Sequence, residues 1–131
     1  MKPVSDLAEL LRTIDPVLNP GTFVFASLKH GTALQPELIV ASINESEGLS
    51  VVMREADAQK SGLNPLFRCA WITLSVNSDL EAVGLTAAFA SALARAGISC
   101  NVIAGAHHDH IFVPIDEAER AVSELRRLQK R

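Results

Sequence analysis

A strand pattern, a glycine turn and a helix pattern follow one another directly, and this order constrains the fold more than any other feature. Over residues 67–76 the apolar residues alternate, which is the period of a β-strand with one buried face. Over residues 85–96 they recur at i, i+3, i+4, i+7, i+8 and i+11, and the many alanines would let such a helix approach a sheet closely. Gly84 closes the turn and Gly97 follows the helix as a natural C′ residue. This arrangement predicts free backbone N–H groups that can hold a small anionic group.

The rest of the chain shows further short elements of both kinds. Apolar runs rich in β-forming residues predict strands over 22–28, 38–44, 49–53, 99–104 and 110–114. Helical spacing predicts helices over 6–14 and 55–60 and a last one from Asp116, and Asn19-Pro20-Gly21 predicts a turn. Residues 49–56 resemble residues 111–118, each an apolar strand leading into a Glu-Ala helix, as a duplicated unit would give.

Composition excludes several classes of protein. A net charge of −3 with 12 basic residues provides no basic face for nucleic acid. No apolar run reaches the roughly 20 residues of a membrane span, and the first residues lack the apolar core of a signal peptide, so we expect a cytoplasmic protein. Cys69 and Cys100 lie on separate predicted strands without CxxC spacing, which predicts buried free thiols.

From Phe67 onward, the order strand, helix, strand, strand, helix is a ferredoxin-like pattern without its last strand. Combined with Glu81–Leu85 and Ala96–Val102, this pattern resembles an ACT domain, and the whole chain resembles small bacterial proteins made of two tandem ACT-like units. The resemblance implies an α+β fold of two ferredoxin-like units with antiparallel sheets and helices on one face. The first unit would span residues 1–64 and the second residues 65–131. The first unit is degenerate, because the helix expected between its first two strands is absent or very short.

The resemblance also implies a non-enzymatic regulatory module that binds a small metabolite, most often an amino acid, at an interface between ACT units and controls a partner protein, with no cofactor. The residues that the family pattern selects for ligand binding are Asn77, Ser78, Glu81, Ala82, Val83, Gly84, Leu85, Ser99, Asn101 and Val102.

The chemistry of these residues agrees with that role. Gly84 permits close backbone approach, the nearby N–H groups could bind a carboxylate, and Glu81 or Asn101 could receive an α-amino group. A structural role is open as well, because Gly84 could serve only the tight turn and Asn101 could satisfy an edge backbone group.

Two other functions remain open. His107-His108-Asp109-His110 offers side chains that bind transition metals, and a metal-dependent enzyme is one alternative. Alternation along a strand separates His108 and His110 from their neighbours, so a metal site would need a third ligand such as His30. We therefore predict no metal site and no catalytic residues, since the sequence has no GxSxG elbow, HExxH helix or phosphate loop. The other alternative is an interaction adaptor without a ligand.

The missing last strand of the second unit bears on assembly. An open sheet edge invites pairing, so we expect the first unit or another subunit to cover it. We also expect a homodimer.

Overall fold

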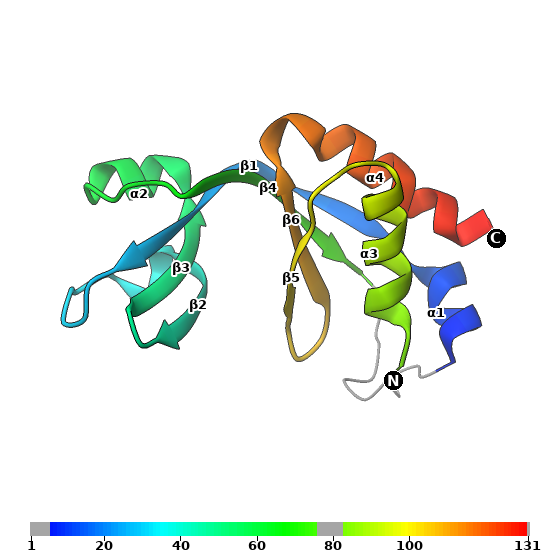
Figure 1. Ribbon diagram of the computed structural model, residues 1–131, viewed down its shortest axis with the longest axis horizontal. Helices are drawn as coiled ribbons and strands as arrows, with labels where there is room; N and C mark the ends of the chain where they lie inside the picture. The colour runs from blue at the N-terminus through cyan, green and yellow to red at the C-terminus, as the bar shows by residue number, and fades with distance from the viewer. Residues whose placement is uncertain (1–5, 76–82, 131) are drawn as a thin grey trace. The chain divides into compact units, whose positions relative to one another are not determined.

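The computed structural model describes residues 6–75 and 83–130, and the chain divides into two compact units. Unit 1 combines Met1–Pro20 with Ala70–Arg131, and unit 2 is Gly21–Cys69. Two strands, β1 (Pro16–Leu28) and β4 (Phe67–Leu74), contribute residues to both units (Figure 1).

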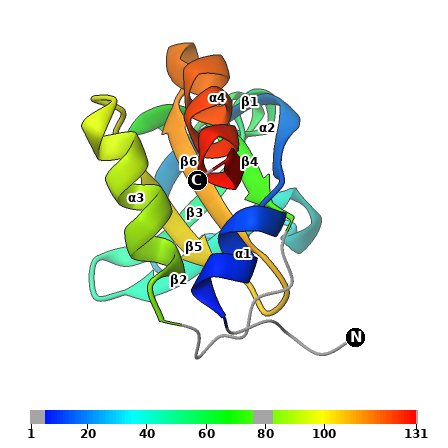
Figure 2. The same cartoon turned by 90° about the vertical axis from the view of Figure 1, so that its right-hand side faces the viewer.

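Unit 1 is a sheet with helices on one face. Its strands lie in the order β1-β4-β6-β5, and β5 (Asn101–Ala104) pairs antiparallel with β6 (Asp109–Pro114). The helices are α1 (Leu7–Thr13), α3 (Leu85–Arg95) and α4 (Ala118–Arg127), with short 3-10 turns at Ile115–Glu117 and Leu128–Lys130. Figure 2 shows the three helices together on the near side of these strands. The predicted order strand, helix, strand, strand, helix is therefore confirmed.

The core of unit 1 lies between this sheet and the helices. β4 contributes Ile72 and Leu74, α3 contributes Phe89 and Leu93, and α1 contributes Leu10, all of them fully buried. The strand alternation that buries Ile72 directs Trp71 to the other face of the sheet. Trp71 therefore does not pack under the helices, and its side chain is only half-buried.

Strand β1 fills the position of the missing last strand. Ser75 N donates to Asp15 O at 2.8 Å and Asn19 Nδ2 donates to Trp71 O at 3.2 Å, so this part of β1 runs antiparallel to β4. Since backbone groups alternate in direction along a strand, the bond at Asp15 turns the backbone of Pro16, Leu18 and Pro20 away from β4.

The predicted turn at Asn19-Pro20-Gly21 is wrong. β1 continues through these residues, because Gly21 adopts a positive φ of 108°, which a glycine tolerates inside a bent strand.

Unit 2 is a smaller α+β unit. Its strand order is β2-β3-β1-β4, in which β3 (Gly48–Arg54) pairs antiparallel with both β1 and β2 (Ile39–Glu45). Helix α2 (Glu55–Lys60) follows β3 directly, and a 3-10 turn at Pro36–Leu38 stands where a ferredoxin-like unit has its first helix. Its core is formed by apolar side chains from β1, β3 and α2: Val24, Ala26, Leu28, Val51, Met53 and Ala58.

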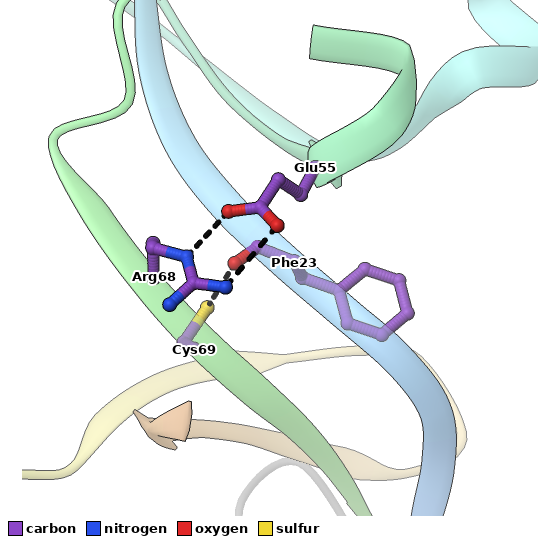
Figure 3. A network of polar contacts seen from close by, with 4 residues as sticks. All are labelled: Phe23, Glu55, Arg68 and Cys69. Atoms are coloured by element: carbon purple, nitrogen blue, oxygen red, sulfur yellow. Dashed lines mark hydrogen bonds and ion pairs between the residues drawn. The ribbon is translucent and has the colours of Figure 1, made fainter. Parts of the chain in front are cut away.

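In unit 2, polar contacts link β4 to the start of α2 and to β1 (Figure 3). Arg68 on β4 forms a two-pronged ion pair with Glu55 at the start of α2, and its hydrogen bond lowers the pKa of the Glu55 carboxyl. Cys69 Sγ lies 3.5 Å from Phe23 O. Burial raises the pKa of the Cys69 thiol to about 12 and that of Cys100 to about 11, so neither is a reactive thiolate.

Both cysteines are free, as predicted, although Cys100 is only half-buried. Each unit thus places helical turns against a sheet of four strands, and the expectation of two tandem ferredoxin-like units is confirmed. Of the helices in the described residues, none combines the length and apolar character that a membrane crossing requires.

Candidate functional site

The residues predicted to bind a ligand fall into two groups around α3. Asn77, Ser78, Glu81 and Ala82 lie outside the described residues. The first described group is Val83, Gly84 and Leu85 at the start of α3, and the second is Ser99, Asn101 and Val102, which follow the end of α3.

The start of α3 has open backbone donors. Gly84 is the N-cap residue with φ +98° in the left-handed region, and no side chain of the described residues caps the helix. The first intrahelical donor is Ala88 N, which bonds to Gly84 O at 2.9 Å, so the three preceding helical N–H groups have no helical acceptor. Val83 is 84% exposed, whereas Leu85 is buried in the core and anchors the turn. The geometry suits a carboxylate or similar anion.

The second group lies at the other end of the helix. Ser99 and Asn101 are exposed, and Asn101 opens β5 opposite Phe112. Val102 is half-buried against the core. The 11 residues of α3 separate the two ends by about 16 Å along the helix axis. Within one unit, the structure therefore does not bring Asn101 to Gly84.

A hydrogen-bonded cluster on the helix-free face of the sheet of unit 1 was missed by sequence reasoning. Trp71 Nε1 donates to His110 Nδ1 at 3.0 Å, and Thr73 Oγ1 lies 3.1 Å from the same nitrogen. Asn19 Nδ2 donates to Thr73 Oγ1 at 2.9 Å. Since indole nitrogen can only donate, His110 Nδ1 accepts and its ring proton sits on Nε2. The alternation of Trp71 and Thr73 on β4 was the signal that could have revealed this cluster.

Protonation of His110 is disfavoured in this cluster. Burial lowers its pKa, and the charge of His108 lowers it further, while Asp109 acts in the opposite direction. Burial also raises the pKa of the Asp109 carboxyl. The neutral imidazole is thereby kept as a hydrogen-bond acceptor for Trp71.

The histidines do not converge on a metal site. His108 Nδ1 is buried and has no hydrogen-bond partner among the described residues, and His110 Nδ1 is occupied by Trp71. His30 bonds instead to Ser46 O at 3.1 Å. Across residues 6–75 and 83–130, no three His, Cys, Asp or Glu side chains gather closely enough to hold a metal ion.

A groove on unit 1 is the second surface that the sequence did not reveal. It has a volume of about 630 Å³ and lies between the start of β1 and one face of α4. Its lining residues are Pro16, Leu18, Glu119, Val122, Ser123, Arg126 and Arg127. The sequence did not reveal this groove because the helical pattern of α4 does not indicate which strand lies beside the helix.

Comparison with known proteins places both halves of the chain in one family. One description of the ACT domain matches residues 2–70, and a second matches residues 66–127. No curated protein sequence matches the chain.

Solved structures share this fold. A Vibrio cholerae protein of unknown function, described as a possible transport protein, is 44% identical, with a TM-score of 0.82 over 94% of this chain and 95% of that one. An Agrobacterium tumefaciens protein is 18% identical, with a TM-score of 0.64 over 88% and 89% of the two chains. The ligand-free regulatory subunit of aspartate kinase from Thermus thermophilus is 11% identical, with a TM-score of 0.62 over 86% and 95%.

Proposed function

Because the chain belongs to the ACT-domain family, we propose that it is a regulatory module whose tandem ACT units, residues 1–64 and 65–131, bind an amino acid and catalyse no reaction. A regulatory subunit of aspartate kinase has the same fold over nearly its whole length, which supports a regulatory role for a chain of this size. Ligand binding would change the activity of a separate partner protein, provided that the ligand prefers one arrangement of the module.

The start of α3 is the observation that carries the proposal. In the described part of the chain, the first helical N–H groups after Gly84 have no side-chain cap, and these groups together with the positive end of the helix dipole suit an α-carboxylate. Leu85 fixes this turn to the core, so the donors are held in place before a ligand arrives. No cofactor is needed for such binding.

The separation of the two predicted groups favours a symmetric homodimer. One amino acid cannot touch both Gly84 and Asn101 of a single unit, because α3 lies between them. In a two-fold dimer, the start of α3 in one copy could face Ser99 and Asn101 of the other, which would complete the contacts to the α-amino group. We place this module in the cytoplasm, where a free thiol such as Cys69 stays reduced.

The experiment is a thermal-shift screen of the full chain against the 20 amino acids, followed by calorimetry on any hit. A ligand at a hundred times its dissociation constant should add about 2.7 kcal/mol to the free energy of unfolding. We expect one amino acid, or a few amino acids with similar side chains, to give such a shift. A flat screen at millimolar concentrations contradicts the proposal.

Thr86 supplies a matched pair of variants. This side chain is exposed in the first turn of α3, so Thr86→Asp should leave the fold intact and favour the helix dipole while it repels a carboxylate. We expect Thr86→Asp to weaken amino-acid binding by at least about tenfold and Thr86→Ala to weaken it little. Equal effects of the two variants would show that the ligand does not bind at this turn. Sedimentation velocity, with and without the ligand, tests the dimer separately.

A further inference from the structure

The groove between β1 and α4 has the size and the charges of a second binding site. Its volume of about 630 Å³ is within the range of small-molecule pockets, and it lies in unit 1 away from the start of α3. One wall is apolar and is formed by Pro16 and Leu18 of β1, and Val122 adds apolar surface from α4. Leu18 is 40% exposed, so this wall has apolar surface that a ligand can cover.

The other wall is a stripe of α4 with opposite charges at its two ends. Glu119, Ser123 and Arg126 follow one another at i, i+4 and i+7 and therefore share a face of the helix. A different face, with Ala121 and Leu125, is buried in the core, which fixes the orientation of the stripe. The helix thus presents a carboxylate, a hydroxyl and a guanidinium to the groove in this order.

Arg126 is the group that is available to a ligand. Its neighbour Arg127 bonds to Glu124 at 3.2 Å, and Arg120 is paired with Glu117. Arg126 forms no ion pair or hydrogen bond with any residue in the described part of the chain. An exposed guanidinium beside apolar surface is a strong site for a carboxylate, because it offers a planar pair of donors.

The spacing of the charges indicates what the groove would bind. Seven residues of helix separate Glu119 from Arg126 by about 10.5 Å along the helix axis. Helical side chains lean toward the N-terminus at both positions, so the two charges stay about this far apart. We propose that this groove is a binding site for a small dipolar molecule with a carboxylate at one end, an ammonium group at the other and several methylene groups between them. The carboxylate pairs with Arg126, the chain lies on Leu18 and Val122, and the ammonium group meets Glu119. This site is independent of the amino-acid site proposed at α3.

The test is a titration of the ¹⁵N-labelled full chain with 6-aminohexanoate, hexanoate and hexylamine, followed by NMR. We expect saturable binding of 6-aminohexanoate, weaker binding of the two singly charged probes, and shift changes centred on residues 16–18 and 118–127. Binding that does not saturate at tens of millimolar, or shift changes centred on the start of α3, overturns the proposal.

Matched variants separate the groove from general charge effects. Arg126→Ala should weaken 6-aminohexanoate binding by about tenfold or more. Arg126 and Glu119 are both exposed, so substitutions at these positions should leave the fold intact. Arg12→Ala removes an exposed arginine of α1 that does not line the groove and should change nothing. Glu119→Gln should remove the preference for 6-aminohexanoate over hexanoate. Equal weakening by Arg126→Ala and Arg12→Ala, or an unchanged preference in Glu119→Gln, contradicts the site.

Discussion

Two glycines with positive φ bracket α3, and they differ in their surroundings. Gly84 has φ +98°, and a Cβ added there would lie 3.0 Å from Leu7 Cδ2. Gly97 has φ +75°, and a Cβ there would meet nothing within 4 Å. The pair therefore separates the cost of the backbone conformation from the cost of a contact.

We expect Gly84→Ala to lower the free energy of unfolding by about 1–2 kcal/mol, because an alanine is strained in the left-handed region and its Cβ displaces Leu7. Gly97→Ala should cost about 1 kcal/mol, for the backbone term alone. Urea denaturation measures both. If Gly97→Ala proves the more harmful change, the contact between Gly84 and Leu7 has no energetic weight.

The neutral state of His110 gives the protein a pH dependence with a definite sign. Burial lowers its pKa below the ordinary 6.5, so below pH 6.5 the unfolded chain binds more protons than the folded one. Folded stability should therefore fall as the pH drops below 6.5 and level off below the folded-state pKa. His110→Gln stays polar but cannot titrate, and it should lose this part of the dependence.

Urea denaturation between pH 7.5 and 5 measures the effect in both proteins. The window stays above pH 5 because Asp109, whose pKa is raised, acts with the opposite sign nearer its own titration range. An identical pH dependence in wild type and His110→Gln would show that His110 is not the group responsible.

At the scale of elements, α1 belongs energetically to the C-terminal part of the chain. Asp6 caps it by accepting from Ala8 N at 2.9 Å, and Leu10 and Ile14 are fully buried in the core of unit 1. A seven-residue helix is marginal by itself in water, so these buried side chains hold it in place.

Leu10→Ala should therefore lower the free energy of unfolding by about 2–4 kcal/mol, because it leaves a cavity in the core. The matched change Leu11→Ala, on the same helix but only half-buried, should cost clearly less. Thermal and urea unfolding of the two variants provide the comparison. Equal losses would mean that α1 contributes through its helical content and not through the core.

Most elements could be predicted from the sequence because their hydrophobic periods are long and unbroken. The helix predicted over 85–96 is found at Leu85–Arg95, and the strand predicted over 49–53 is found at Gly48–Arg54. The turn predicted at Asn19-Pro20-Gly21 failed because a single bent glycine residue and an edge proline are tolerated within a strand. Local turn signals could not reveal that hydrogen bonds to β4, which is distant in sequence, keep this segment extended.

At the scale of the whole molecule, the units of packing are not contiguous in sequence. Unit 1 needs residues from both ends of the chain, since Leu10 and Ile14 complete its core and Asn19 bonds to β4. A fragment of residues 65–131 should therefore not fold alone, although the strand pattern within it is complete except for its last strand.

A chain that joins residues 6–20 to 70–130 through an Asn-Gly turn should fold. The antiparallel contact of Asn19 with Trp71 places Pro20 next to Ala70, so a two-residue turn can connect them. Amide dispersion in NMR and cooperative unfolding distinguish a folded from an unfolded chain. A well-folded 65–131 fragment, or an unfolded joined chain, would contradict this account of the core.

How well each candidate site could be predicted from the sequence depended on whether its residues are close together in the chain. The glycine turn at Gly84 was visible because its signal is local. The cluster of Asn19, Thr73 and His110 and the groove beside α4 were not predicted, because each joins elements that are distant in sequence.

The two prolines of β1 have a consequence for how the protein behaves when it is crowded. Pro16 and Pro20 flank Leu18 on the side of the strand that faces away from β4, and a proline has no N–H to donate. A foreign β-segment that approached this margin would find a single amide donor among three residues, too few to template a ladder. The margin is thereby protected against fibril growth at high protein concentrations, while Pro16 and Leu18 still line the groove beside α4.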